Sequence, residues 1–418
     1  LLPLMKKGMA NMLGLQGWIV YKVETGPDEA HVYVGRPKKE ARCPHCGAVT
    51  RRVHSRSKAW RRVFHGTVVG RKVFLRIRPR PFYCGSCKKA FTETFPGIEK
   101  WSRRTIQGEQ EILSHLVGTS LHQAAKRNGV GDGVVRRVLK RRVMGEVPMK
   151  VALEGLSEVV LGIDEHSFRG QKMMITVTSL APVRRLLAIL PDDRLATLRR
   201  YLQGIPQEVK DRIVGVCIDM KKAWRLELMR QLPHAKVVVD RFHVIQDANR
   251  RVEEARKVEK EVTRRPIPRW PLLKNQEELT PRQAQELRWI YENHANVRHF
   301  HAVKEQLRAV YEAKDRQEAA ALLDRIIFNT QDASDVAMVQ WGRTLKEWRE
   351  AILAFHDLRI TNAFTEGTHT KIKLLKRLSY GFRNAETYIR KMLLGLLPRF
   401  PLELTPHLWA LSPLLLAP

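Results

Sequence analysis

The sequence predicts a mixed α/β protein that is preceded by small basic modules and interrupted by a long helical segment. Two observations lead to this prediction. Between residues 157 and 240, apolar runs of strand length alternate with helical patterns, which is typical of an α/β core. The residues from 241 to 365 lack strand texture, are rich in Glu, Lys, Arg, Gln and Ala, and carry helical patterns over 247–263, 281–313 and 315–328.

The basic modules follow from the charge distribution. The 418 residues contain 75 Lys and Arg against 43 Asp and Glu, a formal net charge of +32. The first 150 residues hold 31 of these cations and only 10 of the acids. Such an excess predicts a polyanionic partner, with nucleic acid ahead of an acidic membrane surface.

Composition also excludes several classes of protein. Hydrophobic residues make up 44% of the chain, so it can bury a core and is not broadly disordered. No apolar run is long enough for a membrane-spanning helix, and five cysteines do not make a secreted disulfide scaffold. We therefore expect a cytoplasmic protein without a membrane partner, whose leucine-rich tail over 393–418 packs on the core or on a second subunit.

Four of the five cysteines form two pairs, each with two intervening residues: Cys43 with Cys46, and Cys84 with Cys87. This spacing lets both sulfurs of a tight turn reach one ion, and two such turns complete a tetrahedral zinc site. The alternatives are two redox pairs or coincidence, but a redox motif should lie beside a βαβ pattern, which is missing here. The pattern favours a structural zinc ribbon, and we expect His45 to be solvated instead of a ligand.

The segments after the first cysteine pair are strongly basic. Between Gly70 and Tyr83, apolar residues alternate with cations, so a strand would place Lys72, Arg76 and Arg78 on one face. Residues 121–142 then fit a helix-turn-helix, with the turn at Gly129. Its second helix carries four cations that suit the DNA major groove or its phosphates: Arg136, Arg137, Lys140 and Arg141. The alternative is a basic surface helix without a ligand.

The predicted core has the order strand, strand, strand, helix, strand, helix, strand. The strands are expected at 159–163, 173–180, 184–190, 213–218 and 236–239, and the helices at 193–202 and 221–232. Asp164 and Asp219 follow the first and fourth strands. This order, with acids at those two strand ends, is the outline of a ribonuclease-H-like fold, a mixed five-stranded sheet with helices.

The acids suggest a reaction. Attack on a phosphodiester needs an activated oxygen nucleophile and charge compensation at phosphorus, which two divalent ions held by carboxylates can supply. Magnesium prefers such hard oxygen ligands, and manganese can replace it. A third carboxylate should come from a later helix, and Glu366 is the best candidate, because Thr361 and Asn362 can cap a helix there.

These motifs carry a family resemblance. The paired CPHCG and CGSC turns, GIDEHSFRG at 162–170, VCIDM at 216–220, VVDRFHVIQ at 238–246 and TNAFTEGTHTKIKLLKRLSYGFRN at 361–384 occur in this order. The chain resembles the DDE transposases of bacterial insertion sequences, most closely the ISL-three family. The resemblance covers nearly the whole chain.

The resemblance implies a transposase that binds the terminal inverted repeats of its element and catalyses metal-dependent DNA cleavage and strand transfer. It implies that Asp164, Asp219 and Glu366 are the catalytic triad and hold two Mg²⁺ ions. It also implies that the protein acts on double-stranded DNA at the nucleoid. It further implies that the protein assembles on DNA as a homodimer or a higher oligomer. The rival hypotheses are a non-catalytic DNA-binding regulator derived from a transposase, whose signature would be a lost acid, and a structure-specific nuclease.

The expected organisation has five parts: a zinc-ribbon domain at 1–100, a helix-turn-helix domain at 101–150, the first part of the catalytic core at 151–246, an all-α insertion at 247–355, and the last core helix with the tail at 356–418. A second basic stripe follows the third acid and is expected to hold DNA phosphates: Lys371, Lys373, Lys376 and Arg377. The insertion is expected to contact DNA or a second subunit, or only to stabilise the core.

Some single residues allow two interpretations. Asp240 and His243 form an Asp-x-x-His pair after the fifth strand, which fits either support of the acids and DNA or a simple helix cap. Cys217 is expected in the core. The tryptophans of the helical part are expected to be core anchors: Trp270, Trp289, Trp341 and Trp348.

Overall fold

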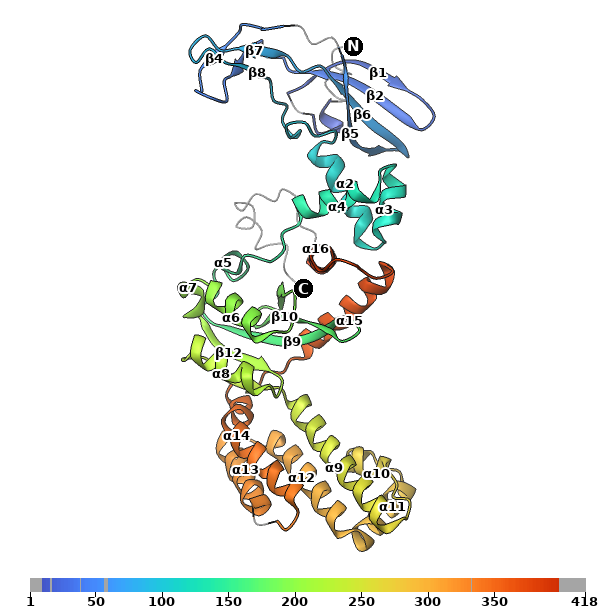
Figure 1. Cartoon of the computed structure of the whole chain (residues 1–418), viewed down its shortest axis with the longest axis vertical. Coiled ribbons are helices and arrows are strands. Elements are labelled where there is room, and N and C mark those ends of the chain that lie inside the picture. Colours follow the sequence, from blue (N-terminus) through green and yellow to red (C-terminus); the bar gives the residue numbers. More distant parts are fainter. Residues whose placement is uncertain (1–9, 16, 38, 56–58, 332, 398–418) are drawn as a thin grey trace. The chain divides into compact units, whose positions relative to one another are not determined.

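The computed structural model describes residues 10–397 except 16, 38, 56–58 and 332, drawn in colour in Figure 1. The described residues form two compact units, one up to Val143 and the other made of most residues from Met144 onward. Most of the predicted tail, residues 398–418, lies outside the described residues. No described helix is long and apolar enough to cross a bilayer.

The first unit is built on a four-stranded sheet in the order β1-β2-β6-β5. Its strands are β1 (Ile19–Thr25), β2 (Glu29–Gly35), β5 (Arg61–Val68) and β6 (Arg71–Ile77). The alternation predicted for 70–83 is confirmed in β6, where Val73, Leu75 and Ile77 are buried in the core of this unit. The strand ends at Ile77, and Pro81 begins another short strand.

The cysteine turns lie in two small hairpins. One is formed by β3 (Ala41–Arg42) and β4 (Val49–Thr50), the other by β7 (Pro81–Tyr83) and β8 (Ala90–Thr92). Within each turn, the residue after the second cysteine has a positive φ: 75° at Gly47 and 57° at Lys88. Glycine takes this conformation without strain, whereas lysine pays a modest steric cost.

The two helices and the turn at Gly129 that were predicted for 121–142 are present. Three helices follow the hairpins: α2 (Ile106–Val117), α3 (Leu121–Asn128) and α4 (Asp132–Arg142). Thr105 and Ser120 cap the first two, each accepting a hydrogen bond from the backbone N–H of the third residue of its helix. Gly129, with φ of 65°, makes the left-handed turn that ends α3, and Val135 and Val138 bury one face of α4.

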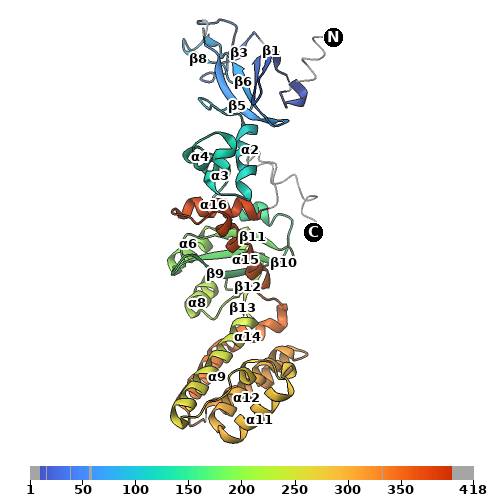
Figure 2. The same cartoon turned by 90° about the vertical axis from the view of Figure 1, so that its right-hand side faces the viewer.

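The second unit contains a five-stranded mixed sheet in the order β11-β10-β9-β12-β13 (Figures 1 and 2). Strands β9, β10 and β11 pair antiparallel, and β12 pairs parallel with both β9 and β13. The strand bounds are β9 (Val159–Arg169), β10 (Lys172–Ala181), β11 (Arg185–Ile189), β12 (Ile213–Ile218) and β13 (Lys236–Val239). Helices α5 (Met149–Ala152), α6 (Leu195–Gly204), α7 (Gln207–Lys210) and α8 (Lys222–Gln231) accompany it. The predicted strand and helix order is therefore confirmed.

The first core strand is longer than predicted. We expected it to end before Asp164, but β9 continues to Arg169 because residues 165–169 pair with β10 in a hairpin that turns at Gly170. In contrast, the pairing of β9 with β12 stops at Ile163 and Ile218. Asp164 therefore lies in a continuing strand, at the level where its neighbour β12 ends.

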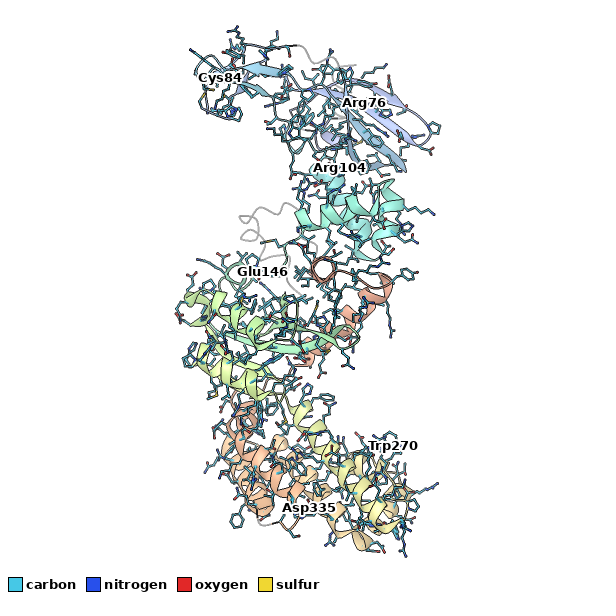
Figure 3. All side chains as sticks on the ribbon, in the orientation of Figure 1. Arg76, Cys84, Arg104, Glu146, Trp270 and Asp335 are labelled. Carbon is cyan, nitrogen blue, oxygen red and sulfur yellow. The ribbon has the colours of Figure 1, made fainter. Side chains whose placement is uncertain are left out.

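The residues after β13 are helical, as predicted. They form α9 (Arg241–Thr263), α10 (Trp270–Leu273), a 3-10 turn (Gln276–Glu278), α11 (Pro281–Asn293), α12 (Ala295–Glu312), α13 (Arg316–Gln331) and α14 (Val336–Leu358). Trp341 and Trp348 are buried core anchors. The same expectation is wrong for Trp270, labelled in Figure 3, and for Trp289, which are 60% and 38% exposed. Trp270 begins the four-residue helix α10, and Trp289 lies on α11, whose buried residues are Leu287 and Ile290.

Two more helices complete this unit, α15 (Ala363–Leu378) and α16 (Ala385–Leu396). The start of α15 packs closely on β9. A side chain at Gly162 would lie within 2.7 Å of the side chains of Asn362 and Thr365, so only glycine allows this approach. Asn362 is buried and donates a hydrogen bond to the carbonyl of Ile163, and Thr365 bonds Thr178 of β10. These contacts fix where α15 presents Glu366.

A buried histidine in α12 gives the helical part a predictable dependence on pH. Burial, followed by the charge of Lys304, lowers the pKa of His301 to about 4, and the neutral ring bonds the hydroxyl of Tyr291. The unfolded chain takes up its proton near pH 6.5, before the folded chain does. The stabilisation is therefore complete above that pH and is lost as the pH falls toward 4.

We expect the free energy of unfolding to fall by about 2 kcal/mol from this group between pH 7.5 and pH 5. Urea unfolding of the wild type and of His301→Gln at both pH values measures it. The variant should be less stable at pH 7.5 but show a smaller loss on acidification. An equal loss in both proteins would contradict the assignment.

Candidate active site and zinc cluster

Asp164 and Asp219 lie side by side at the edge of the sheet. Asp219 directly follows β12, and Asp164 follows the last β9 residue that pairs with β12. Asp164 is only 7% exposed, and its carboxylate accepts a 2.6 Å hydrogen bond from the backbone N–H of Glu165. The parallel pairing of the two strands thus brings together two acids that are 55 positions apart in the chain.

The environment of Asp164 disfavours its charge. Burial is the largest cause and the nearby charge of Asp219 the second, and together they raise the pKa of Asp164 to about 7. Two carboxylates held this closely repel each other unless a cation lies between them. Because the donors are hard oxygens, a divalent ion such as Mg²⁺ fits this position.

The protonated imidazole of His243 provides a positive charge beside these acids. Its Nε2 lies 2.8 Å from a carboxylate oxygen of Asp219. Although burial acts to lower it, the hydrogen bond and charge of Asp219 raise the pKa of His243 to about 9. Asp240 caps α9 and accepts from the N–H of Phe242, which places His243 in the first turn. The helix-cap interpretation is therefore confirmed for Asp240, and His243 contacts Asp219.

Glu366 reaches the same region from the first turn of α15. Ligand atoms of Asp240, His243 and Glu366 all lie within 4.8 Å of one another, and those of Asp164, Asp219 and His243 form a second such group. His243 belongs to both. The three predicted acids do not fall into a single group of this kind.

A chain of buried side chains behind Asp164 was missed by the sequence analysis. His369 of α15 lies 3.4 Å from Asp164 and bonds Thr176, which also bonds His166. The other ring nitrogen of His166 bonds the hydroxyl of Tyr388 in α16. Burial lowers the pKa of His369 to about 4 and that of His166 to about 3, so both rings are neutral. This series of side chains orients Asp164 from the protein interior. No sequence spacing links its members, so a motif search cannot find them.

The predicted DNA-binding cations have different surroundings. On α4, Arg136, Arg137, Lys140 and Arg141 are all exposed. Arg141, however, pairs with the fully buried carboxylate of Glu109 and with Glu99, so part of its role is to hold α4 against α2. Among the described residues, no ion pair involves Arg136 or Arg137. On α15, Lys371, Lys373 and Arg377 are exposed, and Lys376 donates to the carbonyl of Ser167.

The four cysteines of the two hairpins meet in one cluster, and Cys84 is labelled in Figure 3. The sulfurs of Cys43 and Cys87 are 3.6 Å apart, and those of Cys46 and Cys84 are 3.5 Å apart. These distances are too long for a disulfide, but they match the sulfur–sulfur edge of about 3.8 Å that a tetrahedral zinc site requires. The backbone N–H of Cys87 lowers the pKa of Cys84 to about 6, whereas burial raises the pKa of Cys87 to about 12. The geometry of the four sulfurs, and not their acidity, is therefore the evidence for a metal site.

Cys217 lies outside this cluster, buried in β12. The expectation that it is a core residue is therefore confirmed.

Carboxylates gathered at the edge of a mixed sheet, in a chain that also has a four-cysteine cluster, are typical of metal-dependent enzymes that act on nucleic acids. Comparison with known proteins gives the family. The family model DDE_Tnp_ISL3, described as a transposase, matches residues 161–392, more than half of the chain. The chain belongs to this family of DDE transposases, and the resemblance to the ISL-three family is confirmed.

Two transposases of insertion sequences agree with this assignment. The transposase of insertion sequence element IS1001 from Bordetella parapertussis is 25% identical over 401 residues, covering 93% of this chain and 97% of the relative. The transposase of IS1557 from Mycobacterium tuberculosis is 27% identical over 266 residues, covering 56% of this chain and 60% of the relative. Among solved structures, the Drosophila P element transposase strand transfer complex aligns over 68% of this chain and 91% of that chain, with 11% identity and a TM-score of 0.37.

Proposed function

We propose that this transposase binds the terminal inverted repeats of its insertion sequence, cleaves the DNA at the element ends and joins those ends to target DNA. The observation that carries this proposal is the pair of adjacent carboxylates, Asp164 and Asp219, at the edge of the sheet. Glu366 on a helix packed against the same sheet supports it. In this account the five-stranded sheet is a ribonuclease-H-like core, and the helices between β13 and α15 are an insertion into it.

Within this core, Asp164, Asp219 and Glu366 would hold two Mg²⁺ ions, and Mn²⁺ would replace them. Bound there, the ions would supply an activated oxygen nucleophile and charge compensation at phosphorus. Asp164 needs a fixed orientation for this task, and His369 provides it from behind. Asp240 holds the start of α9 and with it His243, which neutralises part of the acidic charge beside the DNA.

The N-terminal domains and the cations of α15 would bind the DNA and position it at the acids. We assign 1–100 to a zinc-ribbon domain and 101–150 to a helix-turn-helix domain, which together read the element ends. The segments 151–246 and 356–418 belong to the core, and 247–355 is the insertion. Lys371, Lys373, Lys376 and Arg377 follow Glu366 on α15 and would contact DNA phosphates near the acids.

The proposed reaction also leads us to expect a particular oligomeric state and cellular location. Joining two ends of one element in a single event requires at least two active sites, so we expect a homodimer or a higher oligomer on DNA. Because its substrate is bacterial DNA, we expect the protein to work in the cytoplasm, at the nucleoid.

The test is a joining assay. Purified protein is incubated with labelled duplexes that carry the element's terminal repeats, a supercoiled target plasmid and Mg²⁺. The proposal predicts label covalently attached to the plasmid. Tight binding of the ends without any cut or joined product would instead support the non-catalytic regulator. Cleavage without preference for the terminal repeats would support a structure-specific nuclease.

Replacing both Arg136 and Arg137 by Ala should weaken binding of the terminal repeats by about tenfold or more at low salt, because two contacts to DNA are lost. The salt dependence of binding should also become shallower. Electrophoretic mobility shifts at several salt concentrations measure both effects. Arg282→Ala, which removes an exposed cation of α11 that pairs with Glu286, is the control. An unchanged affinity in the double variant would exclude this face of α4 as the reader.

A further inference from the structure

A pocket of about 360 Å³ opens at the start of α15 in the second unit. Three segments that are distant in the sequence form its wall: the end of β10 with the loop to β11, the link between α14 and α15, and the first half of α15. Its charged residues are Arg184, Arg359 and Lys371, and no acid is among the described residues that line it. A pocket whose charged groups are all positive attracts an anion.

Two of these cations have no partner in the protein. Arg184 lies in the loop between β10 and β11, and Lys371 lies on α15. Both are exposed, and within the described part of the chain neither side chain takes part in an ion pair or a hydrogen bond. Their N–H donors and their charges are therefore free to bind a ligand, and charge-assisted hydrogen bonds to an anion are the strongest bonds that they can make.

Arg359 adds a third charge, which the protein holds in place. This residue directly follows α14, and its guanidinium donates hydrogen bonds to the backbone carbonyls of Ala313 and Lys314. The carbonyls fix the side chain but do not neutralise it, because no described carboxylate forms an ion pair with it. Two arginines in one wall suit a phosphate group in particular, since the planar guanidinium offers several N–H donors to its oxygens.

The pocket lies beside the proposed metal site without being part of it. Gly367, which directly follows Glu366, is in its wall. Glu366 itself lines a neighbouring cavity that shares Thr361 and Ala363 with this pocket. An anion bound here is therefore close to the acids but is not the phosphate on which they act. A DNA strand carries one phosphate per nucleotide, so a strand held at the acids offers further phosphates close by.

We propose that this pocket binds one backbone phosphate of the DNA, close to the phosphodiester that is cleaved. The inference rests on the proposed function and deepens it, because it adds Arg184 and Arg359 to the residues that contact DNA and places Lys371 in a defined site with them. A phosphate contact carries no sequence information, but it fixes the register of a strand. The pocket thus holds the strand so that the correct phosphodiester lies at the acids.

The test combines protein variants with DNA that lacks single phosphate charges. Duplexes with the terminal repeats are either intact or carry one uncharged methylphosphonate linkage, at each position around the cleavage site in turn. Mobility shifts without added divalent ions measure the affinity, so that no strand is cut. We expect Arg184→Ala and Lys371→Ala each to bind the intact duplex roughly fivefold more weakly than the wild type, because a phosphate contact is lost. Both differences should disappear at the same linkage, where the wild type has no charge to bind.

Arg200→Ala is the matched control, since it removes an exposed arginine of α6 that lies outside the pocket, and it should bind every duplex like the wild type. Unchanged affinity of Arg184→Ala or Lys371→Ala for the intact duplex, or differences that persist at every linkage, would overturn the phosphate pocket and leave the proposed function intact. If both differences disappear at one linkage but the wild type does not cleave the repeats in Mg²⁺, the phosphate contact stands and the proposed reaction fails.

Discussion

Replacing Asp219 by Asn is expected to abolish DNA cleavage while leaving binding of the terminal repeats unchanged. The amide has the shape of the carboxylate but no charge, so it cannot hold a divalent ion. Since metal ions at such sites stabilise charge by several kcal/mol, we expect a rate at least roughly a thousandfold lower. Cleavage of end-labelled DNA in Mg²⁺ measures the rate, and mobility shifts measure binding.

The matched control is Asp211→Asn, eight residues earlier in the chain, at an exposed acid that accepts a hydrogen bond from Gln207. It should cleave like the wild type. Asp164→Asn should be as inactive as Asp219→Asn but more stable than the wild type when metal is absent. The raised pKa of Asp164 means that the folded protein loses stability as the pH rises from about 4 to about 7. The amide removes that loss, and thermal unfolding at pH 8 without added divalent ions would detect it.

An active Asp219→Asn variant would show that this carboxylate does not take part in the reaction. A stable but fully active Asp164→Asn variant would show the same for Asp164.

Replacing Cys84 by Ser is expected to remove zinc from the protein and to abolish recognition of the terminal repeats. The hairpins β3–β4 and β7–β8 are only two or three residues long on each strand, and so cannot hold themselves together without the ion. In small zinc-binding domains the metal contributes on the order of 10 kcal/mol to folding. Metal analysis should find about one zinc per chain in the wild type and none in the variant.

Cys217→Ser is the control for this prediction. It changes a buried cysteine in β12 that lies outside the cluster, so it can lower the stability of the core but should keep the zinc. The zinc assignment would be wrong if the wild type folded fully without metal, or if Cys84→Ser retained the ion and bound the ends as before.

The positions of Asp164 and Asp219 could be predicted from the sequence because both follow apolar runs of strand length. Such runs report burial on a sheet, and acids directly after them are rarely mere surface charges. The order of strands and helices in the second unit could be predicted for the same reason. The extension of β9 to Arg169 could not, because residues 165–169 contain a single apolar side chain, Phe168, and are held in the strand by pairing with β10.

The parts of the site that were missed depend on contacts between distant segments. Asp164, His369, Thr176, His166 and Tyr388 are linked only after α15 and α16 pack on the sheet, and His166 and Tyr388 are 222 positions apart. Each of these histidines stood in a quoted motif, so its presence was visible, but its partners were not.

The central claim is that the carboxylates of Asp164, Asp219 and Glu366 hold the ions that catalyse cleavage. The most direct measurement is the metal dependence of DNA cleavage by Asp219→Cys. A soft thiolate disfavours Mg²⁺ but can still bind Mn²⁺. We expect the wild type to cleave with either ion and the variant to cleave with Mn²⁺ but not with Mg²⁺. Cleavage by the variant in Mg²⁺ at the wild-type rate, or cleavage by the wild type in EDTA, would contradict it.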